Sequence, residues 1–116
     1  MGGSAIYKIL PAALWADVVR AGAFKGAGID LKDGYIHFST AAQVAETARL
    51  HFAGQDGLVL VAVDPATLGA ALKWEPSRGG QLFPHLHGVL DPGAVIWARP
   101  MPLGTDGRHR LPELVA

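Results

Sequence analysis

Three of the five histidines lie in two short segments that read as strands bounded by turn residues. The segment 34–40, GYIHFST, carries His37, and the segment 83–88, FPHLHG, carries His85 and His87. Histidine changes its charge near neutral pH and is also a common metal ligand, so it serves either proton transfer or metal binding. Two histidine-bearing strands in one small domain predict a shared polar cleft, and we expect His37 and His85 to line it.

Alternation along a strand places His37 on the same face as Tyr35 and Ser39. The opposite face carries Ile36 and Phe38, which can supply contacts to a core. The polar face then needs solvent, hydrogen bonds or a ligand, because a buried imidazole without a partner costs on the order of a few kcal/mol. Two interpretations follow: a structural histidine bonded to the backbone, or a binding or catalytic residue.

The spacing of His85 and His87 places both rings on one face of a strand, roughly 7 Å apart. Two imidazoles at that spacing can bind one metal ion, with His37 or Glu75 as the third ligand. The alternative is a hairpin strand whose polar residues face solvent. The spacing alone does not separate these two interpretations.

The sequence Trp74-Glu75-Pro76 places a large aromatic ring beside a lone carboxylate at the end of a strand. If Glu75 lies near the histidines, its charge raises their pKa and orients one ring, which is how a general acid or base is tuned. If it lies at the surface, it is a solvated charge. No glycine pattern of a phosphate-binding loop occurs.

The composition excludes several classes of protein. Ten lysines and arginines balance ten aspartates and glutamates without a basic run, so we expect no nucleic-acid or membrane partner and a small-molecule ligand instead. Cysteine is absent, which removes disulfides and thiolate chemistry. No apolar run approaches the roughly 18 residues of a membrane helix. We expect a cytoplasmic protein.

These residues need a scaffold, and the hydrophobic pattern predicts one domain with alternating strands and helices. A Thr-x-x-Gln capping box at 40–43 marks the start of the second helix, and Gly22 marks the end of the first. The expected elements are a strand at 5–10, a helix at 11–21, a loop at 23–33, a strand at 35–38, a helix from 40 to about 52, a central strand at 58–63, a turn or short helix at 64–68, and strands at 72–76, 82–90 and 94–99.

Tyr7-Lys8-Ile9, Trp74-Glu75 and the two histidine segments together resemble the hallmarks of a small bacterial and plant family known as domain of unknown function 952. The resemblance covers about residues 5–99. That family is akin to the ADP-ribosyltransferase-like fold. The resemblance implies one compact α+β domain over 1–116, with a mostly antiparallel split sheet, two main helices, a nicotinamide dinucleotide cleft and a tail at 100–116.

In enzymes of that fold, a first strand carries a basic residue, a second an aromatic residue and a later strand an acidic residue. The corresponding positions here fall near Lys8, at His37 and near His85, so the acidic residue is missing. Either the cleft binds a nucleotide-like or phosphorylated ligand, or Glu75 takes the acidic role. The site that the resemblance and the spacing predict has His37, Glu75 and His85 as catalytic residues and Lys8, Tyr35, Ser39, Thr40, Trp74 and His87 as ligand-binding residues.

Three hypotheses of different classes remain open. The first is a divergent ADP-ribosyl- or glycosyl-transferase-like enzyme that acts on an NAD or ADP-ribose type of ligand, with NAD as its cofactor. The second is a non-catalytic metabolite-binding module that uses the same cleft. The third is a domain with a metal bound by His37, His85 and His87, whose affinity would fall below about pH 6 as the ligands gain protons.

Overall fold

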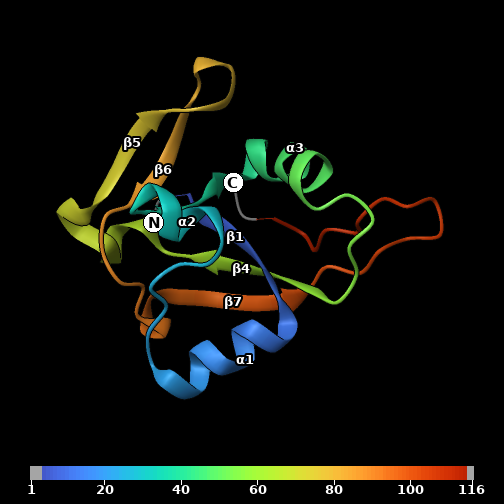
Figure 1. The fold of residues 1–116 in the computed structure, drawn as a ribbon, viewed down its shortest axis with the longest axis horizontal. Coiled ribbons are helices and arrows are strands. Elements are labelled where there is room, and N and C mark those ends of the chain that lie inside the picture. The colour runs from blue at the N-terminus through green and yellow to red at the C-terminus, as the bar shows by residue number, and fades with distance from the viewer. Residues whose placement is uncertain (1–3, 115–116) are drawn as a thin grey trace.

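A computed structural model describes residues 4–114 of the chain (Figure 1). It is one α+β domain whose strands are joined by three helices and three short 3₁₀ segments. The strands are β1 (Ile6–Pro11), β2 (Ile36–His37), β3 (Ser39–Thr40), β4 (Leu58–Val63), β5 (Leu72–Pro76), β6 (Leu82–Leu86) and β7 (Val95–Pro100). The helices are α1 (Ala12–Ala21), α2 (Ile29–Asp33) and α3 (Ala41–His51), and the 3₁₀ segments are Pro65–Ala71, Arg78–Gly80 and Pro92–Ala94.

The strands form two antiparallel sheets, as the predicted split sheet requires. The larger sheet has the order β3-β1-β4-β7, and the smaller sheet has the order β2-β6-β5. In Figure 1 the β5–β6 hairpin projects away from the larger sheet, so that the two sheets diverge from the region where β2 and β3 meet. The apolar run 58–63 forms β4, an inner strand of the larger sheet, as predicted from its length and continuous hydrophobicity.

The strand predicted at 35–38 is present but shorter, as β2, and a second short strand, β3, that was not predicted follows it in the other sheet. His37 pairs with His85 in the smaller sheet, whereas Ser39 pairs with Tyr7 in the larger one. Phe38 lies between them and donates its backbone N–H to the carbonyl of Pro84 at 3.0 Å. The chain therefore changes sheets within a few residues, and a period-2 pattern does not reveal such a change.

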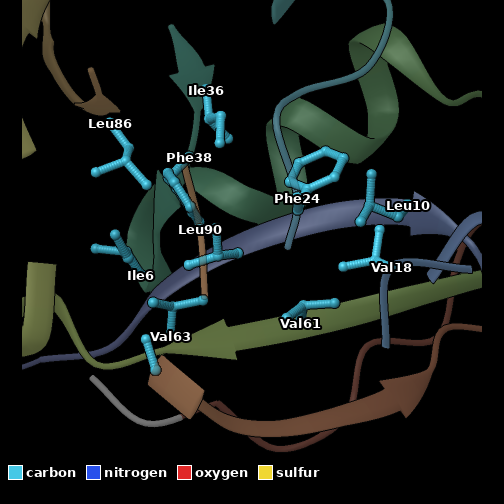
Figure 2. Close-up of a cluster of buried hydrophobic side chains, with 11 residues drawn as sticks. Ile6, Leu10, Val18, Phe24, Ile36, Phe38, Val61, Val63, Leu86 and Leu90 are labelled. Carbon is cyan, nitrogen blue, oxygen red and sulfur yellow. The ribbon is translucent and has the colours of Figure 1, made fainter. Parts of the chain in front are cut away.

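Each face of the larger sheet is covered by a separate core. The first core lies between β1 and β4 on one side and α1 and the smaller sheet on the other (Figure 2). The second core lies on the opposite face, where Val44 and Ala48 of α3 pack against Tyr7 and Leu60. Met101 is fully buried in this second core, so the tail that was predicted from residue 100 contributes to the interior at its start.

The ends of the two main helices follow the local signals in the sequence. Gly22 has φ 77°, a left-handed conformation that glycine adopts easily, and its N–H donates to the carbonyl of Val18. At the start of α3 the backbone N–H of Thr40 donates to Gln43 Oε1 at 3.0 Å, which completes the predicted capping box. Among residues 4–114, no helix is long and apolar enough to cross a membrane.

The predicted loop 23–33 is more ordered than the sequence suggested. Phe24 forms an isolated β-bridge with Leu90, and the short helix α2 follows. α2 ends at Gly34, whose φ of 85° again needs the left-handed region. Within α2, Asp30 is buried, whereas the apolar Leu31 is exposed. This inverted pattern explains why no helical period was visible in the sequence.

Candidate functional site

A cavity of about 500 Å³ opens where the two sheets diverge. β3 pairs only with Ile6 and Tyr7 at the start of β1, so the rest of that edge of β1 borders the cavity, while its other edge pairs with β4. The other walls come from the segment before α2, the β2–β3 junction, α3 and the cavity-facing side of β6. A cavity of this volume is typical of small-molecule sites.

A buried carboxylate organises the wall formed by β1 and β2. Asp30 accepts hydrogen bonds from Lys8 Nζ at 2.9 Å, from the backbone N–H of His37 at 3.0 Å and from His37 Nδ1 at 2.6 Å. Burial alone would raise the pKa of Asp30, but the hydrogen bonds from His37 and the charge of Lys8 outweigh it and lower the pKa to about 2. Burial also lowers the pKa of Lys8, against the opposing effect of Asp30.

His37 is held by carboxylates on both sides of its ring. Nδ1 contacts Asp30, and Nε2 lies 3.0 Å from Asp33 Oδ2. Both acids belong to α2, so this helix presents them together to one imidazole. Of the two interpretations of His37, the structure shows a histidine at the cavity wall whose ring contacts two carboxylate side chains.

His85 is paired with the carboxylate predicted for it. Its Nδ1 lies 2.9 Å from Glu75 Oε1, and His87 Nε2 lies 2.8 Å from the same oxygen. Because an ionised carboxylate only accepts, His85 carries its proton on Nδ1 and its Nε2 keeps a lone pair. Burial lowers the pKa of His85 and the charges of His37 and His87 act in the same direction, whereas the hydrogen bond to Glu75 opposes them. The two histidines lower the pKa of Glu75 in return.

Tyr35 packs against all three histidine rings. Its ring centroid lies 4.7 Å from that of His37, 4.4 Å from that of His85 and 4.9 Å from that of His87. His37 and His85 themselves approach to 5.2 Å in an edge-on arrangement. Burial and the charges of Asp33 and Glu75 raise the pKa of the Tyr35 hydroxyl. The aromatic contacts fix the orientation of the rings at the cavity.

The opposite wall carries hydroxyl groups and an arginine. Ser39 Oγ lies 2.9 Å from Thr47 Oγ1, which donates to the carbonyl of Gln43 at 3.1 Å. Arg78 Nη2 reaches the same threonine oxygen at 3.3 Å. Asp30, Thr47 and Arg78 were not among the predicted site residues. Their contacts join segments far apart in sequence, and neither spacing nor periodicity signals such contacts.

The structure brings most predicted site residues together but not all of them. Lys8, His37, Ser39 and His85 line the cavity, and Glu75, Tyr35 and His87 lie directly behind the histidines. Thr40 serves as the helix cap of α3 and does not line the cavity. Trp74 is 48% exposed and also lies outside the lining. Adjacent residues of a strand face opposite sides, so Trp74 points away from the face that carries Glu75.

The contacts of His37, His85 and His87 also bear on the metal site that the sequence predicted for these residues. Glu75 contacts one nitrogen each of His85 and His87, and Asp30 and Asp33 contact both nitrogens of His37. Within the described part of the chain, no three or more histidine, aspartate or glutamate side chains form a group that could hold a metal ion.

The chain matches the protein family described as "Protein of unknown function (DUF952)" over residues 9–98. It is also similar to protein CC0527 from Caulobacter crescentus. The crystal structure of that protein superposes with a TM-score of 0.89 at 45% sequence identity, over 93% of this chain and 95% of the other. Its solution NMR structure gives a TM-score of 0.81 at 46% identity, over 90% of each chain. No curated protein matches this chain.

Proposed function

The chain belongs to the DUF952 family of proteins of unknown function, and from that premise we propose that its cleft binds a small organic ligand on which His85 acts as a general base. Glu75 holds the base in place, and Tyr35 and His37 fix its ring. The observation that carries the proposal is the position of His85, which is 2% exposed, bonded through Nδ1 to Glu75 and part of the cavity wall.

The arrangement has the properties that general-base catalysis needs. A carboxylate on Nδ1 sets the tautomer and leaves Nε2 free to accept a proton, as in other carboxylate-oriented histidines. Because the pKa of His85 is lowered, the base form dominates at neutral pH. The imidazole of His37 lies next to this base, and its contacts with Asp30 and Asp33 hold it in place at the cavity wall.

NAD and ADP-ribose are the ligands that we propose to test first. The reason is the likeness to the ADP-ribosyltransferase fold, in which a dinucleotide lies in the cleft of a split antiparallel sheet. The two diverging sheets and the cavity between them are in keeping with that likeness. In this version of the proposal Glu75 and His85 take the place of the acidic residue, and Lys8 and Ser39 line the same cavity as His85.

The experiment is a titration of isotope-labelled protein with NAD and, in parallel, with ADP-ribose and zinc, followed by the NMR signals of the histidine rings. Release of nicotinamide from NAD is measured on the same samples. We expect saturable shifts at His37 and His85, and a loss of nicotinamide release in His85→Gln with binding retained. His109→Gln, which changes a histidine outside the cavity, is the matched control. If neither NAD nor ADP-ribose shifts the NMR signals of the cavity residues, this ligand class is excluded.

A second candidate function is a non-catalytic binding module. It is favoured by the Lys8–Asp30–His37–Asp33 network, whose charged groups satisfy one another and need no reactive role. The same titration distinguishes the two candidates. Saturable binding by both the native protein and His85→Gln, with no nicotinamide released by either protein, would support the binding module over the enzyme.

A further inference from the structure

We propose that Arg78 selects anionic ligands for this cleft and binds a carboxylate or phosphate group on the ligand. The inference rests on the proposed function, which specified only a small organic ligand, and it adds the charge of that ligand. The described residues that line the cavity include Lys8, Arg78 and three of the five histidines, but no aspartate or glutamate. A wall of this kind, in a chain with equal numbers of acidic and basic residues, favours negative charge in the ligand.

The cations on the wall are not equally available to a ligand. Lys8 is ion-paired with Asp30 at 2.8 Å, and His37 lies between two carboxylates. The charge of Lys8 is therefore largely balanced within the protein, and the ring of His37 already has two carboxylate partners. Arg78 has one nearby acid, Glu46, at 3.8 Å, which is beyond hydrogen-bond distance and on an exposed side chain. Arg78 is thus the cation of the wall whose charge is least compensated.

Arg78 is also oriented for binding. Its guanidinium lies over the ring of Phe83, 4.9 Å from the centroid, and its side chain is 26% exposed. Its contacts with Thr47 and Glu46 both use Nη2. Among the described residues the Nε and Nη1 hydrogens of Arg78 have no partner, so each of them can donate to an oxyanion on a ligand. The aromatic ring beneath fixes the plane of the group.

The strand β6 sets the distance between the anion and the reacting atom. Phe83 and His85 are two residues apart on the same face of this strand, and both line the cavity, whereas Pro84 between them does not. Their side chains are therefore roughly 7 Å apart. A ligand bound by Arg78 above Phe83 and deprotonated by His85 carries its anionic group at about this distance from the reacting hydrogen.

The test compares charged and uncharged probes of similar size. Benzoate and phenyl phosphate are the anionic probes, and benzyl alcohol is the uncharged one. Binding is measured by NMR from the signals of Arg78 Nε, Phe83 and His85. The variants are Arg78→Gln and, as a control, Arg49→Gln, which removes an exposed arginine that contacts the same Glu46 but lies outside the cavity.

We expect both anions to bind more tightly than benzyl alcohol and Arg78→Gln to weaken them by at least about tenfold, since hydrogen bonds to charged groups are the stronger ones. Arg49→Gln should leave the affinity unchanged. Tighter binding of phenyl phosphate would assign the site to phosphates, and tighter binding of benzoate would assign it to carboxylates.

Two outcomes would overturn the inference, and they are distinguishable. If the probes shift Phe83 and His85 equally in the native protein and in Arg78→Gln, the cleft binds ligands without the help of Arg78 and the proposed function stands alone. If neither the anions nor benzyl alcohol shift any cavity residue, the cleft is not a ligand site, and the inference fails together with the proposed function.

Discussion

At the scale of single residues, the site is defined by two histidines in contrasting environments. His37 has a carboxylate at each ring nitrogen, whereas His85 has one carboxylate at Nδ1 and a lowered pKa. The two rings are 5.2 Å apart. A histidine at a cavity wall whose pKa is shifted by burial and by a specific carboxylate partner, as His85 is, marks a candidate functional site.

The substitution Glu75→Gln should lower the pKa of His85 further, because the carboxylate opposes the effect of burial. The measurement is a pH titration of the His85 ring carbon and nitrogen signals, with Glu46→Gln as an exposed control. A pKa of His85 that rises in Glu75→Gln would contradict this account of the pair.

The same pKa shift makes stability depend on pH. A histidine whose folded pKa lies below its unfolded value of 6.5 contributes stability that is complete above that pH. This contribution is lost as the pH falls through the folded pKa, because the unfolded chain then binds the proton more readily. The contribution of His85 to stability therefore decreases as the pH falls below 6.5 and does not change further below its folded pKa.

At the scale of elements, α2 is attached to the sheets mainly through Asp30. This five-residue helix is too short to be stable by itself, and its apolar residues Ile29 and Leu31 are exposed. Asp30 links it to β1 through Lys8 and to β2 through His37. The segment before α2 forms part of the cavity wall, so the position of this carboxylate determines the shape of the cleft.

Asp30→Asn should lower the free energy of unfolding by about 3 kcal/mol, because it leaves Lys8 buried without a counter-charge. Since the pKa of Asp30 is lowered from 3.8 to about 2, its contribution to stability is complete above about pH 4 and is lost as the pH falls through 2. Urea denaturation at several pH values measures both effects. Asp33→Asn, whose side chain is partly exposed, is the control; an equal loss in the two variants would argue against the special role of Asp30.

Elements with local signals were predictable, and elements held by distant contacts were not. The C-cap at Gly22 and the capping box at Thr40 are encoded within one helical turn, so the sequence alone located both helices. α2 has no such signal, because its one buried residue is an aspartate. Trp74 was placed in the site beside Glu75, although neighbouring residues in a strand cannot both face one cleft.

At the scale of the whole molecule, the two sheets are coupled through Phe38. It lies between β2 and β3, is 2% exposed and belongs to the first core, and its ring also borders the cavity. The antiparallel arrangement of the strands was expected from the family resemblance. The change from one sheet to the other was not predictable, because the sequence predicted a strand at 35–38 and a helix from residue 40, with no signal for a second strand between them.

Phe38→Ala should lower the free energy of unfolding by about 3–5 kcal/mol, because it leaves a cavity where the sheets meet. The measurement is chemical denaturation followed by circular dichroism. Trp74→Ala removes a larger but half-exposed ring from the same smaller sheet and should cost much less. A similar loss in the two variants would mean that Phe38 does not couple the sheets.

The path of the chain from β2 into β3 also determines where the protein tolerates insertions. Ile36 faces the core and His37 the cavity, so one inserted residue would turn every later side chain of this segment to the wrong face. The turn closed by the bridge between Leu103 and His109 is different, because its tip at 105–108 is exposed. An epitope tag or fluorescent label placed in that tip leaves the register of both sheets intact.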